Sequence, residues 1–145
     1  MANGFRCNCF ITSALDVIGD KWSLVIVKHM LLGGKKTFKD LLESEEGIAS
    51  SILASRLKKL EEFKIVTKRG IPENKKTKIY LLTDKGLALT PAIVELALWS
   101  SDHMAEFHAS FSTDEHIERA RKGRAKYADW VIKEYTERVR EPYTT

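Results

Sequence analysis

The sequence has little of what secretion or membrane insertion requires. Among its 145 residues there are two cysteines, three prolines and eight glycines, too few for a disulfide framework or a long low-complexity linker. The longest apolar run, Trp22 to Val27, is interrupted by Ser23 and is much shorter than the roughly 20 residues that span a bilayer. The first residues lack the apolar stretch of a signal peptide. We therefore expect a cytoplasmic protein with no membrane association, whose cysteines are thiols at rest.

Signatures of catalysis and of metal binding are also missing. The sequence has no Gly-rich phosphate loop and no Ser/His/Asp arrangement with a local signature, so we do not expect an enzyme. Cys7 and Cys9 are separated by one residue, and none of the four histidines stands at the spacing of a structural zinc site relative to them. We expect neither a metal nor another cofactor.

Positive charge is concentrated in the first part of the chain. Residues 1–90 hold 16 Lys and Arg against 10 Asp and Glu, whereas residues 91–145 hold 8 against 10. The excess is densest from Arg56 to Lys85, where 10 basic residues meet four acidic ones. Such a localised basic stretch is the electrostatic footprint of a protein that binds a polyanion. The alternative is a solvated charged face.

The order of predicted elements describes a winged helix. Hydrophobic periodicity and capping residues predict helices, then two strands, then two further helices. The first predicted helix is capped by Thr12 or Ser13 and ends at Ile18. Further helices are predicted over residues 22–32, 37–44 and 48–63, and the two strands over residues 64–69 and 78–82. The last two helices are predicted over residues 87–111 and 117–139. The predicted fold is mainly α with a small β-hairpin wing (α+β).

The helix predicted over residues 48–63 suits a DNA major groove. Leu53, Leu57 and Leu60 fall within one arc and are predicted to face the core. The opposite side offers hydroxyls for close approach and long donors for phosphates and base edges. The candidate DNA-binding residues on this helix are Ser51, Ser55, Arg56, Lys58 and Lys59. An ordinary amphipathic surface helix is the alternative.

A second basic cluster lies at or near the tip of the predicted hairpin. Its members are Lys68, Arg69, Lys75, Lys76 and Lys78. A wing in this position can contact phosphates or the adjacent minor groove. A solvated loop would have the same composition.

Cys7 and Cys9 are candidate redox-sensing residues. Cys9 precedes a predicted helix and Arg6 is close in sequence; a helix N-terminus and nearby cations both lower the pKa of a thiol. Cys7 could resolve a sulfenate at Cys9 or pair across a dimer. The alternative is a pair of inert thiols near a chain end.

Several stretches, in this order, resemble the HxlR-type branch of the MarR-like winged-helix regulators. The first are Cys9-Phe10-Ile11 and Ala14 to Trp22, similar to the N-terminal signature of that family, and Phe38-Lys39-Asp40-Leu41, similar to its second helix. The others are Gly47-Ile48 through Leu53, Arg56-Leu57 and Leu60-Glu61, similar to its recognition helix, and Tyr80 to Thr83 with Lys85-Gly86, similar to the strand and cap after its wing. The similarity is distributed over residues 9–100.

The resemblance implies a transcription regulator that binds double-stranded DNA as a homodimer on an inverted-repeat operator. It places the start of the recognition helix near Ala49 and the wing at residues 69–78. It also implies dimerisation through residues 11–18 and 87–111, and a response to a small electrophile or oxidant through Cys9. Residues 1–112 would form the winged helix-turn-helix domain, with residues 113–145 as a C-terminal helical extension.

Three departures from the family pattern have physical consequences. Phe10 stands where Pro is usual after the cysteine, which weakens the transfer of the sensing role. Ala49 stands where Ser often begins the recognition helix, so we expect a weaker N-cap. Lys64 stands where Gly is usual, so either the turn differs or Lys64 has a left-handed backbone that costs about 1 kcal/mol.

Two other functions are compatible with the sequence. The first is a thiol-based sensor whose main output is a conformational change, with DNA binding as its readout. The second is a winged helix that binds proteins and has no specific DNA binding. The clustering of cations on the predicted recognition helix and wing argues against the second, which an acidic or apolar recognition face would favour.

Overall fold

The structure, a computed structural model, describes residues 4–108 and 114–144. It comprises two compact units, Met1–Gly86 and Leu87–Thr145. The first unit carries the predicted helices and hairpin, and the second consists of helices. The predicted boundary at residues 112 and 113 lies outside the described residues, so the division into a domain of residues 1–112 and an extension of residues 113–145 stays a prediction.

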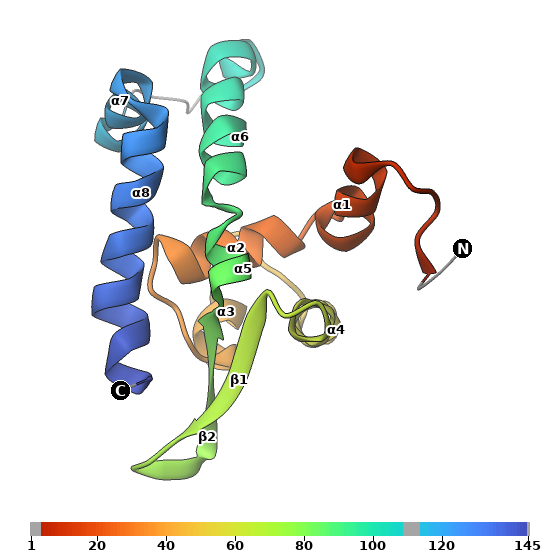
Figure 1. Cartoon of the computed structure of the whole chain (residues 1–145), viewed down its shortest axis with the longest axis vertical. Coiled ribbons are helices and arrows are strands. Elements are labelled where there is room, and N and C mark those ends of the chain that lie inside the picture. Colours follow the sequence, from red (N-terminus) through yellow and green to blue (C-terminus); the bar gives the residue numbers. More distant parts are fainter. Residues whose placement is uncertain (1–3, 109–113, 145) are drawn as a thin grey trace. The chain divides into compact units, whose positions relative to one another are not determined.

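The first unit has the element order of a winged helix (Figure 1). In chain order the elements are α1 (Phe10–Ile18), α2 (Ser23–Leu31), α3 (Phe38–Leu42), α4 (Ser50–Glu62), β1 (Val66–Ile71), β2 (Asn74–Leu82) and α5 (Asp84–Leu87), the last of which reaches the boundary of the second unit. The two strands form one antiparallel sheet. The predicted fold class, mainly α with a β-hairpin wing, is confirmed.

Local capping explains where two of these helices begin. Thr37 Oγ1 accepts a hydrogen bond of 3.1 Å from the backbone N–H of Asp40, and Thr83 Oγ1 accepts one of 3.1 Å from the backbone N–H of Gly86. Both threonines therefore satisfy a free N–H of a first helical turn.

The predicted start of α1 is wrong. The helix begins at Phe10, with Cys9 in extended backbone as its N-cap, rather than after Thr12 or Ser13. Ser13 is already inside the helix, where its backbone N–H donates to the Cys9 carbonyl at 2.9 Å. Its hydroxyl donates to the Cys7 carbonyl at 3.4 Å instead of capping.

Within the first unit, the hairpin is held to the helices at its base and extends away from them at its tip (Figure 1). Val66 pairs with Leu82 and Gly70 with Lys78, and the register shifts after Gly70. At the base, the backbone N–H of Tyr80 donates to the Lys36 carbonyl at 2.7 Å. A Cβ built at Gly86 would collide with the carbonyl of Ile65, so only glycine allows this approach.

The core of the first unit lies between α2, α3, α4 and the base of the hairpin. Leu53, Leu57 and Leu60 of α4 are almost completely buried, as their spacing predicts. They are accompanied by buried apolar side chains of the other elements: Ile26, Val27, Met30, Leu31, Leu41, Ile65, Val66, Ile79, Leu81 and Leu82. This core fixes which side of α4 faces solvent.

The second unit is built from helices that pack on one another. Its elements are α6 (Thr90–His103), η2 (Ala105–Phe107), α7 (Glu115–Lys122), α8 (Arg124–Tyr135), η3 (Thr136–Arg140) and η4 (Glu141–Tyr143). Helices α6 and α8 lie side by side (Figure 1). Their buried side chains include Val94, Leu98, Tyr127, Val131 and Tyr135.

Two predicted long helices are interrupted. The helix predicted over residues 87–111 is wrong in its extent, because α5 ends at Leu87, α6 begins at Thr90 and α6 ends at His103. Pro91 favours a helix start at this point, since its missing N–H is not needed in a first turn. The helix predicted over residues 117–139 is broken at Gly123, whose extended backbone ends α7 and precedes α8. The last predicted residues of the first of these helices, 109–111, lie outside the described residues.

Candidate nucleic-acid interface and cysteine arm

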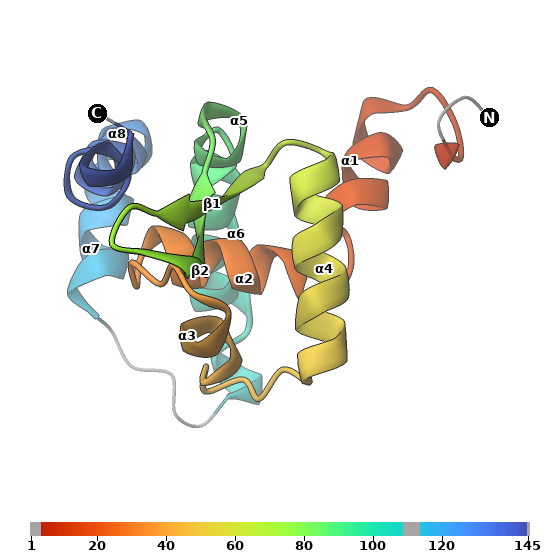
Figure 2. The same cartoon turned by 90° about the horizontal axis from the view of Figure 1, so that it is seen from below.

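Helix α4 presents small polar and basic side chains to solvent. Ser51, Ser55 and Lys58 are exposed, whereas the leucines of the opposite side are buried. Figure 2 shows α4 lengthwise, with α3 and the hairpin to its left. Ala49 is the N-cap, and its side chain makes no capping hydrogen bond. The predicted weak N-cap is therefore confirmed, and the first backbone N–H groups of α4 stay available to another acceptor.

Arg56 of α4 is directed to the turn between α1 and α2. Its Nε lies 3.0 Å from Asp20 Oδ2, and the Arg56 side chain is only 32% exposed. Asp20 accepts hydrogen bonds from the backbone N–H groups of Trp22 at 2.9 Å and Ser23 at 3.0 Å. Partial burial raises the pKa of Asp20, but Ser23, Trp22 and Arg56 outweigh burial and lower it. In the free protein, Arg56 therefore holds α4 to the turn between α1 and α2.

Lys59 joins α4 to α1. Its Nζ donates a 2.7 Å hydrogen bond to the carbonyl of Asp16, which belongs to the last turn of α1. A cation at the C-terminal carbonyls of a helix is favourable because these carbonyls carry the negative end of the helix dipole. The two cations predicted to face DNA, Arg56 and Lys59, thus also hold α4 in place.

The turn that precedes α4 is held by a carboxylate. Glu46 accepts hydrogen bonds from Lys28 Nζ and, at 2.7 Å, from His29 Nε2, both of them on α2. Partial burial would raise the pKa of Glu46, but these two partners outweigh burial and lower it to about 2. The ionised carboxylate therefore ties the turn of the helix-turn-helix to α2.

The wing carries exposed cations along both strands. The side chains of Lys68, Arg69, Lys76 and Lys78 are exposed, and Lys68 Nζ lies 5.8 Å from the centre of the Tyr80 ring. The backbone of Lys75 belongs to β2, but its side chain lies outside the described part of the structure. The tip is ordered by Asn74, whose Oδ1 accepts from the backbone N–H of Lys76 at 3.1 Å. The wing is thus a second positive surface of the same unit as α4.

Lys64 connects α4 to the wing through an unusual backbone conformation. Its φ is 63°, which lies in the left-handed region that side chains with a Cβ disfavour. Of the two alternatives that the sequence left open at this position, a different turn or a left-handed backbone, Lys64 adopts the second.

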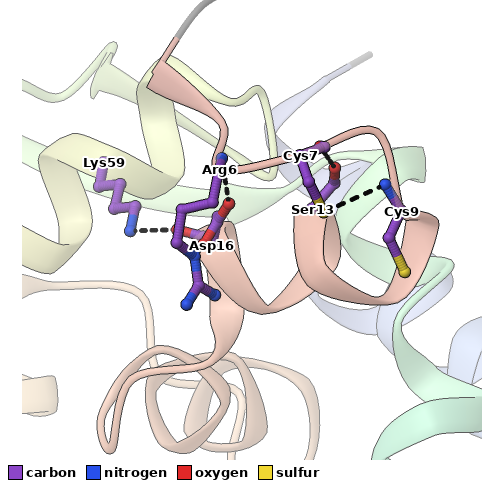
Figure 3. A network of polar contacts seen from close by, with 6 residues as sticks. All are labelled: Arg6, Cys7, Cys9, Ser13, Asp16 and Lys59. Carbon is purple, nitrogen blue, oxygen red and sulfur yellow. Dashed lines mark hydrogen bonds and ion pairs between the residues drawn. The ribbon is translucent and has the colours of Figure 1, made fainter. Parts of the chain in front are cut away.

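Both cysteines are exposed free thiols, and Figure 3 shows them at the start of α1. The pKa of Cys9 is lowered by the backbone N–H of Thr12, then by the Thr12 hydroxyl and the backbone N–H of Ile11, because these donors stabilise a thiolate at the helix N-terminus. Cys7 Sγ accepts from the backbone N–H of Cys9 at 3.4 Å. Arg6 binds Asp16, so the cation expected beside Cys9 is directed elsewhere.

Large apolar side chains stay exposed on two helices. On α1 the exposed fractions are 93% for Phe10, 73% for Ile11 and 53% for Leu15. On α6 they are 52% for Leu96 and 56% for Trp99. Both helices fall in the ranges expected to form a dimer, and exposed apolar side chains of this size are typical of association surfaces.

Three arginines of the second unit make contacts within that unit. Arg121 lies 2.6 Å from Asp102 of α6, and Arg124 lies 3.0 Å from Glu95 of α6. The guanidinium of Arg119 lies 4.0 Å from the centre of the Trp130 ring. These contacts favour a packing role for these three arginines over a role in DNA binding.

Metal-holding clusters and membrane-spanning helices are absent from the described part of the chain. Among residues 4–108 and 114–144, no group of three or more His, Cys, Asp and Glu residues lies together in a way that could hold a metal ion. Within the same ranges no helix has the length and apolar character to cross a membrane.

The carboxylates that organise the interface were not predicted from the sequence. Asp16 and Asp20 both belong to the stretch Ala14 to Trp22 that resembles the family signature, which was the available signal. Glu46 offered no such signal, because its partners Lys28 and His29 are distant in the sequence.

Comparison with known proteins places these features in a family. The model of the HxlR-like helix-turn-helix family matches residues 17–108. The HTH-type transcriptional regulator YodB of Bacillus subtilis (strain 168) is 39% identical over 88 residues, which cover 61% of this chain and 78% of YodB.

Solved structures agree with the fold. The crystal structure of PA1607 superposes with a TM-score of 0.63 and 34% identity, over 76% of this chain and 71% of PA1607. The reduced form of YodB from B. subtilis superposes with a TM-score of 0.56 and 34% identity, over 67% of this chain and 95% of YodB. A quinone-bound YodB structure gives 0.53 and 35% identity, over 63% and 96% of the two chains.

Proposed function

Because the chain belongs to the HxlR-like helix-turn-helix family, we propose that it regulates transcription as a homodimer bound to an inverted-repeat operator. It is a DNA-binding transcription regulator with a winged helix-turn-helix. The observation that carries the proposal is the position of α4 and the wing in one compact unit, both with exposed polar and basic side chains. One α4 would enter the major groove of each half-site, with half-sites about one helical turn apart.

The DNA contacts divide into two groups. On α4, Ser51, Ser55 and Lys58 approach base edges and phosphates, and Arg56 and Lys59 add positive charge while they brace the helix. On the wing, Lys68, Arg69, Lys75, Lys76 and Lys78 contact phosphates. Phosphate contacts set register and affinity, whereas base contacts set sequence preference.

A matched pair of lysine variants tests the assignment of α4. Lys58→Ala removes an exposed cation of α4, and Lys126→Ala removes an exposed cation of α8. We expect Lys58→Ala to weaken binding to the operator by roughly 1 kcal/mol or more, about fivefold. Fluorescence anisotropy with a labelled duplex measures both variants. Equal affinities for the two would contradict the assignment.

Dimerisation is supported by the exposed apolar side chains of α1 and α6. Phe10, Ile11 and Leu15 follow a helical spacing on α1, and Leu96 and Trp99 do so on α6. Leu15→Glu places a charge among these side chains, so we expect a monomer in sedimentation velocity and weaker operator binding. A dimer of unchanged stability would show that α1 is not part of the dimer interface.

Sensing of a small electrophile or oxidant is supported by Cys9. Its thiol is exposed and its pKa is lowered, which raises the fraction of reactive thiolate at neutral pH. The relative YodB has been crystallised with a bound quinone and after diamide treatment. We expect addition of one quinone to Cys9, with a new C–S bond and a proton transferred to the ring oxygen. Mass spectrometry of the wild type and of Cys9→Ser measures this reaction.

A further inference from the structure

A short N-terminal arm contacts the C-terminal end of α4. The arm, residues 5–9, lies outside residues 17–108, which the family model matches. The ring of Phe5 lies edge to face against that of Phe63, with centroids 6.0 Å apart and an angle of 65°. Phe63 is the C-cap of α4. An aromatic pair of this geometry contributes beyond its buried area, so the arm is attached directly to the end of α4.

Arg6 attaches the same arm to α1. Its backbone N–H and its Nε donate to the two carboxylate oxygens of Asp16, at 3.2 Å and 2.5 Å. The Asp16 side chain is only 15% exposed, and its pKa is lowered, first by the backbone N–H of Arg6. The backbone carbonyl of this same Asp16 accepts from Lys59 of α4. Asp16 is therefore the point at which the arm, α1 and α4 meet (Figure 3).

We propose that Phe5 and Arg6 are positioning residues that strap the C-terminal end of α4 to α1, and that a covalent change at Cys7 or Cys9 releases this strap. The strap fixes the orientation of α4 relative to α1. The inference rests on the proposed DNA-binding function of α4, because the strap would set the orientation in which α4 enters the groove.

The two cysteines lie where the strap turns into α1. Cys7 follows Arg6 directly; its Sγ accepts from the Cys9 backbone N–H at 3.4 Å, and its carbonyl accepts from Ser13 Oγ at 3.4 Å. A group attached to Cys7 Sγ adds bulk beside Arg6 and competes with the Cys9 contact. A group attached to Cys9 acts at the N-cap of α1. Either change alters the backbone bend that places Phe5 next to Phe63 and Arg6 next to Asp16.

A maleimide reproduces such a change without an oxidant. The thiolate sulfur forms a C–S bond with one alkene carbon, and the neighbouring carbon takes up a proton from water. In the wild type this reaction should release the strap, whereas a protein with Cys7→Ser and Cys9→Ser should not react. The modified wild type is then comparable with variants that lack the strap.

The test measures the strap in two independent ways. Hydrogen exchange of the peptide that covers residues 56–65 reports on the end of α4 without DNA, and anisotropy reports on operator binding. The variants are Phe5→Ala, which leaves the charge unchanged, and Arg6→Gln. Arg138→Gln is the control, because it removes one positive charge from a side chain that is 78% exposed and pairs with Glu134 in the other unit.

We expect both strap variants to exchange faster at residues 56–65 and to bind the operator about fivefold more weakly than Arg138→Gln, at the low end of typical coupling between sites. The double variant should match the single ones, because Phe5 and Arg6 form one strap, and maleimide should change none of the three further. Thermal unfolding should stay within a few degrees of wild type.

The outcomes separate this inference from the proposed function. Exchange and affinity equal to those of Arg138→Gln would overturn the strap. Faster exchange without weaker binding would equally overturn its role in positioning α4. If the wild type failed to bind any operator while Phe5→Ala exchanged faster, the DNA-binding proposal would fail and the contact between arm and α4 would stand.

Discussion

Replacing Glu46 by Gln tests how the turn before α4 is held. The change keeps the shape of the side chain and removes the charge that Lys28 Nζ and His29 Nε2 contact. The amide can still accept one hydrogen bond, but the charge-assisted pair with Lys28 is lost. We expect the free energy of unfolding to fall and the approach of α4 to DNA to become less well defined.

The magnitude follows from the pKa of Glu46. Its pKa falls from 4.5 to about 2, which corresponds to at most about 3 kcal/mol of extra stability for the ionised form. The Glu46 side chain is 26% exposed, so solvent screening reduces this to about 1–2 kcal/mol. For a chain of this size that is a decrease of roughly 3–8 °C in Tm at neutral pH.

The contribution of Glu46 to stability should depend on pH, in a direction set by its lowered pKa. A carboxylate whose pKa is lowered in the folded state contributes its full stability above the unfolded pKa of about 4.5, and loses it as the pH falls toward about 2. The difference in Tm between the wild type and Glu46→Gln should therefore shrink between pH 5 and pH 2. Circular dichroism melts at several pH values measure it, with the exposed neighbour Glu45→Gln as the control. A difference that is absent at pH 7, or that does not change with pH, would refute the reasoning.

Three further substitutions follow from the structure. Lys64→Gly should raise stability by about 0.5–1 kcal/mol, because φ at this position is 63°; a destabilised variant in urea unfolding would contradict the assigned backbone strain. Ala49→Ser should add about 1 kcal/mol by capping α4; an unchanged urea midpoint would show that the N-cap is already satisfied. Lys76→Ala on the wing should weaken binding to all duplexes alike and lower the salt slope by about one; an unchanged slope would remove Lys76 from the phosphate contacts.

The helix-turn-helix and the wing could be predicted from sequence because their signals are local. Leu53, Leu57 and Leu60 share a helical arc, and Thr37 and Thr83 precede the helices they cap, so periodicity and capping suffice. The left-handed backbone at Lys64 was one of the two alternatives that followed from the residue type usual in the family. Each of these features depends on residues within a few positions of one another.

The contacts that position α4 could not be predicted in the same way. Asp16 meets Lys59 across 43 positions, and Glu46 meets Lys28 across 18, so no local pattern relates the partners. For the same reason Arg56 and Lys59 were predicted as groove residues without their bracing contacts. The breaks near Pro91 and at Gly123 were missed because apolar and charged periodicity continues through them.

The central claim, specific and thiol-controlled DNA binding, is tested most directly with the upstream intergenic DNA of the protein's own gene. Binding of a fluorescent fragment is measured across a salt series with competitor DNA, before and after diamide, for the wild type and for a protein with both Cys7→Ser and Cys9→Ser. We predict tight, steeply salt-dependent binding of both proteins, with loss on oxidation of the wild type only. Binding of the reduced wild type no stronger than to random duplex, or a loss on oxidation that the double variant shares, would contradict the account.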